Sequence, residues 1–406
     1  MKVFKFFLTK IFLKRWIFSL SMIILLFAEN YLLFTVSRSL CSAYQGYKEM
    51  RNMDREDIYI ANLDPNKEVD FDAITKEKTQ KVYDYLDDNF KYALYTDGFI
   101  ISLPNDDGME ISMNYINEEY YKLNQNKLSA GKKLYFNYEF KKDEIPVLIG
   151  KGLSRTYPLG STIRIEDPVV EQPITLKVQG ILEQNAHHSN FYALNSKSYY
   201  NFSIFLPVND EFIRNSNIDL QVNGLMDMIV LQSTKEKTVN LSENIQEVLG
   251  IKFNYFNQKE NNDFFKDYYL NSLKIICILT LIIVIFMICL SVWNMVVCIR
   301  LIIKDFTINL LVGLSYARLK KILYNYLGIL FLINFAAIFF ITAYDRHEFW
   351  VKKDTLFVTY GVFGLIDIDW LALLVVLLFD IVFGIVIVGI MMKKIKKIPV
   401  SLGVLQ

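Results

Sequence analysis

The sequence predicts an α-helical membrane protein with four transmembrane helices, one N-terminal and three C-terminal, and an extracytoplasmic α+β domain between the first and the second. Hydrophobic residues make up 53% of the 406 residues, which is high for a soluble protein. Four stretches are long enough to cross a bilayer, since roughly 20 apolar residues span its hydrocarbon core. The predicted transmembrane helices are residues 16–37, 272–299, 322–344 and 370–392.

The charges of the five segments outside the predicted helices predict the orientation of the chain in the membrane. Residues 1–15, 300–321 and 393–406 are rich in lysine and arginine, whereas residues 38–271 hold 26 basic and 35 acidic side chains. Residues 345–369 are also acid-rich. Because cytoplasmic segments of membrane proteins carry excess positive charge, we expect both termini to be cytoplasmic and residues 38–271 and 345–369 to be extracytoplasmic. We expect the chain to lie in a bacterial plasma membrane.

The first cytoplasmic segment has an amphipathic pattern. Phe4, Phe7, Ile11 and Phe12 alternate with lysines over residues 1–15. This pattern is typical of a helix that lies in the inner-leaflet interface. A plain positively charged flank explains the same residues equally well.

The extracytoplasmic segment combines helical and strand patterns. Asp72 is positioned to cap a helix that carries Val82 and Leu86, and Gly250 is positioned to end a second helix. Asn105–Gly108 has the composition of a turn with strands on either side. The clearest strand candidates, rich in β-branched and aliphatic residues, are Pro146–Ile149, Thr162–Ile165, Ile174–Leu182 and Met228–Leu231.

The sequence offers little for catalysis. It contains no Gly-x-x-x-x-Gly-Lys-Ser/Thr nucleotide loop and no nucleophile motif of a hydrolase. His187 and His188 are adjacent but lack a set of metal-ligand partners, so we expect them to lie in a solvated loop. We therefore expect a non-enzymatic protein with no cofactor or metal and no nucleic-acid partner.

Two acidic residues lie within predicted transmembrane helices. Asp380 falls in the middle of the fourth, and Glu29 lies toward the outer end of the first. A carboxylate in the bilayer centre is costly and usually faces another helix or a cavity. We expect an interhelical or dimer-facing role for Asp380. For Glu29 we favour simple proximity to the outer interface.

Several short motifs resemble one permease family. Gly131–Phe136, Pro146–Gly150, Leu159–Ile163 and Val178–Leu182 are similar in order and type to a pattern of glycine turns and aliphatic strands in the extracytoplasmic domain of FtsX/MacB-type ABC transporter permeases. We expect each of these glycines to lie at a strand end or a turn that needs positive φ. The terminal residues Lys397–Leu402 resemble the family's Pro-x-x-x-Leu ending. The topology of one helix, a large domain and three helices is also that of the family.

The segment after the second helix resembles the family's coupling helix, which contacts the ATPase in the cytoplasm. Asp305 stands where the family has glutamate, and Leu310 where an arginine is common. The positions that the resemblance assigns to ATPase coupling are Asp305, Ile308, Gly313, Leu314, Ser315 and Arg318.

The resemblance implies a permease subunit that works with a separate cytoplasmic ABC ATPase, which binds the ATP. The chain would pair with a second copy or a related permease, with or without an extracytoplasmic accessory protein. It would move its extracytoplasmic domain to export an amphipathic ligand such as an antimicrobial peptide, a lipopeptide, a lipoprotein or a haem-like molecule. A continuous helix from Phe264 to Ile299 would act as a lever.

Two alternatives stay open at this point. The chain could be an FtsX-like mechanotransmitter that activates a cell-wall hydrolase without transport, or a membrane-anchored receptor or structural protein without an ATPase.

Overall fold

The chain folds into two compact units. The computed structural model describes residues 2–124, 126–190, 194–265 and 271–397. The helical unit comprises Met1–Ser42, Ser272–Asp345 and Leu365–Gln406, and the α+β unit comprises Ala43–Asn271 and Arg346–Gly364. The chain therefore passes from one unit to the other four times.

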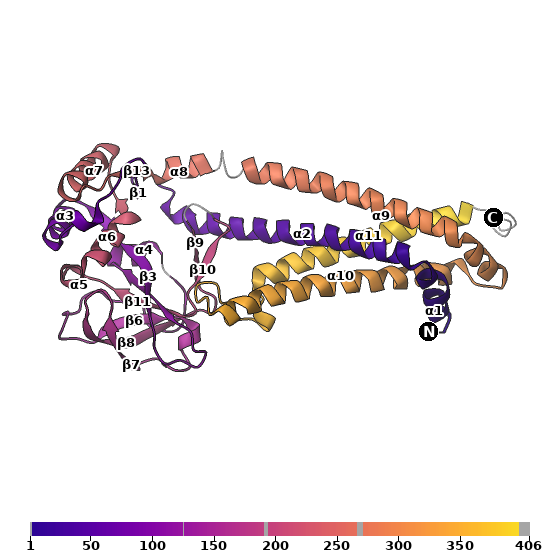
Figure 1. Ribbon diagram of the computed structural model, residues 1–406, viewed down its shortest axis with the longest axis horizontal. Coiled ribbons are helices and arrows are strands. Elements are labelled where there is room, and N and C mark those ends of the chain that lie inside the picture. The colour runs from indigo at the N-terminus through magenta and orange to yellow at the C-terminus, as the bar shows by residue number, and fades with distance from the viewer. Residues whose placement is uncertain (1, 125, 191–193, 266–270, 398–406) are drawn as a thin grey trace. The chain divides into compact units, whose positions relative to one another are not determined.

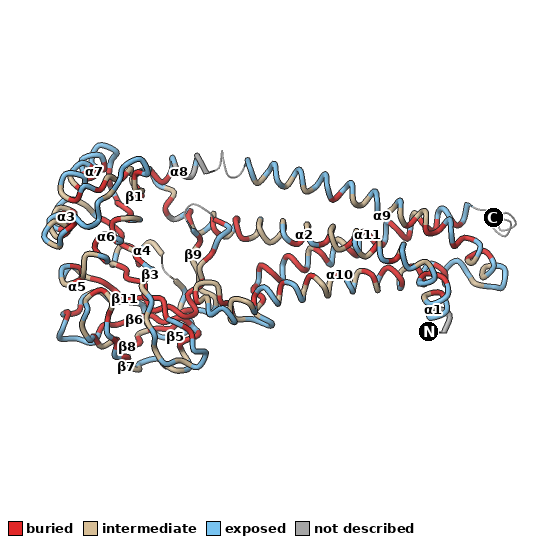
Figure 2. The backbone as a smooth tube through the Cα atoms, in the orientation of Figure 1, coloured by how far each residue is buried: buried red, intermediate tan, exposed pale blue. Residues whose placement is uncertain are grey.

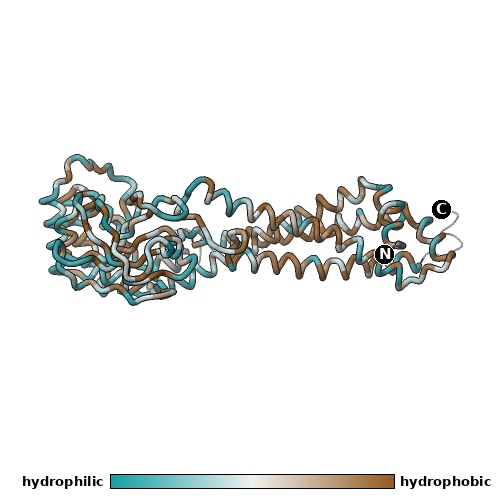
Figure 3. The backbone as a smooth tube through the Cα atoms, turned by 90° about the horizontal axis from the view of Figure 1, so that it is seen from below, coloured by the Kyte–Doolittle hydropathy of each residue, from teal (hydrophilic) through white to brown (hydrophobic). Residues whose placement is uncertain are grey.

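Four long helices carry the apolar stretches, and they confirm the predicted fold class (Figure 1). They are α2 (Trp16–Met50), α9 (Asn271–Leu311), α10 (Tyr316–Lys352) and α11 (Asp367–Lys397). Hydrophobic residues run along all four helices (Figure 3). Each helix is longer than its predicted apolar stretch, because the helix continues into the polar residues that flank the stretch.

The N-terminal segment consists of α1 (Lys2–Phe6), a π-helical turn (Phe7–Phe12) and a 3-10 turn (Leu13–Arg15). Phe7, Ile11 and Phe12 are buried against other helices. The ring of Phe12 stacks on Tyr326 of α10 at 4.0 Å, and Phe7 stacks on Phe306 of α9 at 5.9 Å. The apolar face that suggested an interfacial helix is thus covered by protein.

The larger sheet of the α+β unit has seven strands. Their order is β3-β4-β11-β6-β8-β5, with β7 paired to β8. Strands β4, β6 and β11 are buried along their whole length, including Ser112 and Asn114 of β4, whereas β7 alternates exposed and buried residues (Figure 2). The strands are β3 (Tyr95–Ile101), β4 (Ile111–Ile116), β5 (Leu128–Gly131), β6 (Ile145–Ile149), β7 (Thr162–Asp167), β8 (Gln172–Leu182) and β11 (Ser203–Pro207).

A second sheet has the order β13-β1-β12-β2. Helices α3, α6 and α7 pack with this sheet into the main hydrophobic core. Its strands are β1 (Tyr59–Leu63), β2 (Lys91–Ala93), β12 (Ile229–Leu231) and β13 (Phe253–Asn257), and β9 (His187–Ser189) and β10 (Lys197–Tyr199) form a separate hairpin. The helices are α3 (Lys76–Asn89), α4 (Glu118–Leu123), α5 (Asp210–Asn215), α6 (Ile218–Met226), α7 (Lys235–Leu249) and α8 (Gln258–Phe265). Short 3-10 turns occupy Arg51–Met53, Phe71–Ala73, Lys151–Leu153 and Val362–Gly364.

Several local predictions are confirmed. The four strand candidates correspond to β6, β7, β8 and β12. Gly250 ends α7 with a φ of 74°. Asn105 closes the predicted turn, since its carbonyl accepts a hydrogen bond from the Gly108 N–H at 3.2 Å. The cap of α3 differs: Asp70 caps the short turn Phe71–Ala73, and Thr75 caps the helix itself, so the prediction that Asp72 caps it was wrong.

Two further expectations are corrected. Gly131 and Gly160 have the expected positive φ, but Gly150 and Gly180 do not. Gly150 has a φ of −66°, and glycine is required there because an added Cβ would lie 1.8 Å from the carbonyl oxygen of Tyr200. At Gly180, within β8, an added Cβ would lie 2.8 Å from the Lys132 carbonyl oxygen. His187 and His188 form strand β9 instead of a solvated loop. The imidazole of His188 stacks on the ring of Tyr200 at 5.3 Å, and this burial lowers the pKa of His188.

Residues 346–364, expected to form a connecting loop, belong to the α+β unit. Val358 is buried in its main core, and the Asn201 side chain donates a hydrogen bond to the Val358 carbonyl at 3.0 Å. The Tyr199 N–H donates to the Leu356 carbonyl at 2.7 Å. This segment therefore belongs to the domain that residues 38–271 were expected to form alone, and the structure begins that domain at Ala43.

Two sequence predictions fall partly outside the described residues. The proposed lever helix from Phe264 to Ile299 includes residues 266–270, which the structure does not describe, between α8 and α9. The terminal motif resembling Pro-x-x-x-Leu lies in residues 398–402, also outside the described residues. Both stay predictions.

Candidate functional site

The predicted coupling residues lie at the turn between α9 and α10. Residues 300–321 were expected to form a separate cytoplasmic segment, but α9 continues to Leu311 and α10 begins at Tyr316. Only Val312–Ser315 connects the two helices. The two long helices thus form a hairpin with a four-residue turn.

Gly313 gives this turn its geometry. It has a φ of 104°, in the left-handed region that glycine tolerates best. Its N–H donates to the Leu310 carbonyl at 3.1 Å, and the Leu314 N–H donates to the Asn309 carbonyl at 2.9 Å. These two bonds define a Schellman motif, which satisfies the last carbonyls of α9. The Ser315 hydroxyl then caps α10 by accepting from the Arg318 N–H at 3.3 Å.

The turn presents an exposed apolar surface, the hairpin tip, formed by Ile308, Leu311 and Val312. Their exposed fractions are 43%, 61% and 84%. Leu314 instead packs toward the helical core, and Asp305 is half-buried on α9. The structure thus places all six predicted coupling positions at this turn. Ile308 belongs to the exposed apolar surface, whereas Gly313, Leu314 and Ser315 fix the conformation of the turn. Leu311 and Val312 were missed because the sequence motif emphasised the glycine and the polar residues.

The two intramembrane acids lie on different helices and are both buried. Glu29 of α2 is 0% exposed, and its carboxylate accepts a hydrogen bond from the Ser291 hydroxyl of α9 at 2.7 Å. Protein surrounds Glu29, so proximity to a membrane interface does not describe its environment. Asp380 of α11 is 2% exposed, and its two carboxylate oxygens accept hydrogen bonds from the Asn30 amide nitrogen at 3.0 and 3.2 Å. These contacts join α2 to α9 and to α11.

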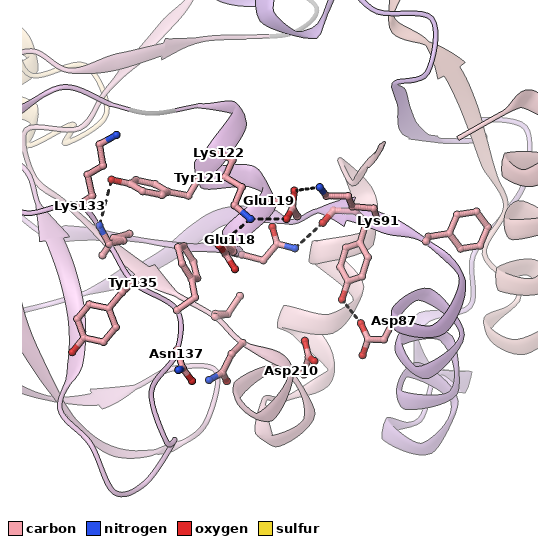
Figure 4. A pocket seen from close by; sticks show the side chains of 17 residues that line it. Asp87, Lys91, Glu118, Glu119, Tyr121, Lys122, Lys133, Tyr135, Asn137 and Asp210 are labelled. Carbon is pink, nitrogen blue, oxygen red and sulfur yellow. Dashed lines mark hydrogen bonds and ion pairs between the residues drawn. The ribbon is translucent and has the colours of Figure 1, made fainter. Parts of the chain in front are cut away.

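A cleft of about 800 Å³ opens in the α+β unit (Figure 4). Its size is within the usual range of small-molecule and peptide sites. One wall carries Lys122, whose ammonium is 2.9 Å from the carboxylates of both Glu118 and Glu119. Hydrogen bonds to these two carboxylates raise the pKa of Lys122. Lys91 also pairs with Glu119, at 3.1 Å.

Aromatic and polar residues share the rest of the cleft. Its aromatic residues are Phe90, Tyr92, Tyr121, Tyr135 and Phe136, of which Tyr135 is 48% exposed. Its other polar residues are Asp87, Asn117, Lys133, Asn137, Asn209 and Asp210. Among the described residues that line the cleft there is no serine, threonine, cysteine or histidine. The cleft thus presents aromatic side chains beside paired charges.

Comparison with protein-family models and with curated proteins finds no match. Solved structures that are similar to part of the chain include two permease domains. The first is the extracellular domain of the noncanonic ABC-type transporter YknZ from Gram-positive bacteria, with 15% identity and a TM-score of 0.31 over 49% of this chain and 100% of that one. The second is a domain of a permease protein from Porphyromonas gingivalis, with 13% identity and a TM-score of 0.29 over 50% of this chain and 90% of that one.

Proposed function

We propose that this chain is the membrane-spanning permease subunit of an ABC system, driven by an ATPase on a separate chain. The hairpin tip carries this proposal. It is an exposed apolar surface on a rigid, capped turn, and it coincides with the residues that resemble the family's coupling segment.

The chemistry of the hairpin tip suits docking into a groove of another protein. Leu311 and Val312 expose apolar surface whose burial contributes about 25 cal/mol per Å². The two Schellman hydrogen bonds hold the turn in one conformation before a partner binds, so little conformational entropy is lost on docking. Lys304 and Arg318 are exposed on either side of the turn and would contact acidic groups at the rim of the groove.

Helix α10 offers a second route for mechanical coupling besides the predicted lever before α9. It begins directly after the turn at Tyr316 and ends at Lys352, inside the segment that belongs to the α+β unit. Its 37 residues correspond to about 55 Å of continuous helix. In this proposal, ATP-driven displacement of the hairpin tip is transmitted along α10 to the α+β unit. The unit would lie on the extracytoplasmic side, as the lysine and arginine distribution predicts.

The cleft supports the export of an amphipathic ligand over hydrolase activation without transport. A protein that only transmits force has no need for a cleft of about 800 Å³ with exposed Tyr135 and paired charges. We propose that the cleft receives the ligand and that movement of the unit releases it. Pairing with a second copy or a related permease remains part of the proposal.

The ATPase contact can be tested with Val312→Asp in the full-length, affinity-tagged chain. Val312 is 84% exposed, so a charge there should leave folding intact while disrupting an apolar contact. We expect wild-type chain to co-purify with a protein that carries the Gly-x-x-x-x-Gly-Lys-Ser/Thr loop, and the variant to lose it at least about tenfold. Val239→Asp is the matched control, since Val239 is exposed on α7. Equal recovery with wild type and Val312→Asp would refute docking at the hairpin tip.

Ligand export is tested separately. Tyr135→Ala should lower cellular resistance to an amphipathic antimicrobial peptide without reducing recovery of the ATPase. Leu159→Ala, at another exposed apolar position of the same unit, should leave resistance unchanged. If Tyr135→Ala and Leu159→Ala behave alike, the cleft does not bind the ligand, even if the ATPase contact is real.

A further inference from the structure

A buried polar cluster joins three membrane-spanning helices and takes no part in the function proposed above. Glu29 and Asn30 are consecutive residues of α2, and both side chains are fully buried. The Ser291 hydroxyl of α9 bonds Glu29, and Asn30 bonds Asp380 of α11. We call these four residues the polar cluster.

The polar cluster has too few hydrogen-bond donors. Its two carboxylates and one amide contain five acceptor oxygens, whereas the Ser291 hydroxyl and the Asn30 amide supply three hydrogens. Accordingly, Glu29 Oε2 and Asn30 Oδ1 are buried without a hydrogen-bond partner. A buried acceptor without a donor costs about 1–3 kcal/mol. Both oxygens need a hydrogen that the neighbouring side chains do not provide.

The charge of the polar cluster is also uncompensated. Glu29 and Asp380 are the acidic residues of the four predicted transmembrane stretches, residues 16–37, 272–299, 322–344 and 370–392. The basic residue within these stretches is Lys274, near the start of the second, which is 17 residues along α9 from Ser291. The groups facing the pair from α9 and α2 are the uncharged Ser291 and Asn30. Two carboxylates that act on each other across a membrane-embedded contact cannot both be ionised without a large desolvation cost.

The same two helices carry a compensated pair for comparison. Asp369 of α11 is as deeply buried as Asp380, but the Arg38 guanidinium of α2 lies 2.9 Å from its carboxylate. Asp369 forms an ion pair with Arg38, whereas Asp380 accepts a hydrogen bond from the neutral Asn30. The polar cluster thus lacks the positive charge that the neighbouring contact contains.

We propose that Glu29 and Asp380 form a proton-binding site within the membrane-spanning helices, occupied by at least one exchangeable proton. A proton on either carboxylate removes one negative charge and adds the missing donor. Its release leaves two like charges between α2 and α11 and weakens their contact. Proton binding and release at this site therefore act on the packing of the helices, whether or not an ATPase docks at the hairpin tip.

The site can be tested with a hydrophobic carbodiimide, which modifies carboxylic acids in their protonated form. Full-length protein in lipid nanodiscs is treated from acidic to alkaline pH, and modified residues are identified by mass spectrometry. We expect labelling at Glu29 or Asp380 that falls about tenfold per pH unit once the proton is lost. Asp369 is the internal control, because its carboxylate is already paired with the Arg38 guanidinium at 2.9 Å, and we expect no labelling there.

The variants and a sodium series make the test decisive. Glu29→Gln and Asp380→Asn remove one acid while keeping a side chain of similar size, and each should change the pH dependence of labelling at the other. Labelling that is absent from both acids, or equal at Asp369, overturns the proposal. Loss of labelling when Na⁺ is added at constant pH would also overturn it, because the site would then bind a metal cation in place of the proton.

Discussion

Arg38 and Asp369 connect the first and last long helices through an ion pair whose acid is completely buried. The Arg38 Nε lies 2.9 Å from Asp369 Oδ1. The other carboxylate oxygen, Oδ2, accepts a hydrogen bond from the Ile366 N–H at 3.1 Å and so caps the start of α11. One side chain thereby fixes both the beginning of α11 and its contact with α2.

Removing Arg38 should destabilise the helical unit strongly. Arg38→Ala leaves a buried carboxylate without its counter-charge, for which we expect a loss of about 3 kcal/mol. Thermal stability of the solubilised protein, followed by size-exclusion chromatography after heating, measures this loss. Arg55→Ala serves as the control, because the Arg55–Asp57 pair is solvent-exposed and should contribute less than about 1 kcal/mol. Similar losses for the two variants would show that burial of Asp369 does not matter.

Substitution of Gly313 should act through the backbone. An added Cβ at Gly313 meets no atom within 4 Å, but its φ of 104° is unfavourable for any other residue. Gly313→Ala should therefore cost about 1–2 kcal/mol and loosen the turn. Hydrogen exchange should show faster exchange of the Leu314 amide in this variant. Gly328→Ala, at an open position inside α10, is the control and should leave that exchange rate unchanged.

The α+β unit should become less stable as pH rises through the folded-state pKa of Asp167. Burial raises the pKa of Asp167 above its usual value of 3.8, despite hydrogen bonds from the Val170 and Val169 N–H groups and the Tyr115 hydroxyl. A folded-state pKa above the unfolded value means that the native state binds the proton more tightly. The stabilisation is complete below about 3.8 and is lost as pH rises through the raised value.

Asp167→Asn tests this pH dependence. The variant cannot titrate at residue 167, so the pH-dependent loss should be smaller than in the wild type. Hydrogen exchange of the full-length protein measures this loss of stability. The protection of the β7 and β8 amides is followed over a pH series and corrected for intrinsic exchange. An unchanged pH profile in the variant would show that another group is responsible.

Asn201 should be required for the attachment of residues 346–364. Its buried amide donates to the Val358 carbonyl and to Asn185 Oδ1, both at 3.0 Å. Asn201→Ala leaves the buried Val358 carbonyl without this donor, whereas Asn185 Oδ1 keeps its bond from the Tyr360 N–H, and the change should cost about 1–3 kcal/mol. Limited proteolysis should then cleave the 346–364 segment faster. Asn89→Ala removes an amide that bonds an exposed helical carbonyl, and it should not change the cleavage rate.

The elements that the sequence predicts well depend on local patterns. The four long helices follow from the length of their apolar stretches, and the end of α7 follows from Gly250 alone. Strands such as β6 and β7 follow from runs or alternation of β-branched and aliphatic residues. Each of these signals lies within a few residues of the element it specifies.

The contacts that the sequence does not predict join residues far apart in the chain. Val358 lies 157 residues from Asn201, and Ser291 lies 262 residues from Glu29. The residue types in these pairs do not indicate which residue each one contacts. From the sequence, Glu29 therefore resembled an interfacial residue, and residues 346–364 resembled a loop. Two residues of the hairpin tip, Leu311 and Val312, were missed for a related reason. Leu311 and Val312 look like the end of an apolar helix until the turn places them at the surface.

The four passages of the chain between its two units restrict how this protein can be engineered. The α+β unit is made of two separate pieces of sequence, Ala43–Asn271 and Arg346–Gly364. In a chimera that exchanges only the longer piece, residues 346–364 would still come from the other parent. Val358 and its neighbouring carbonyl groups would then not match the core into which they pack. A functional exchange, or a soluble version of the unit, therefore needs both pieces from one parent, joined by a designed linker.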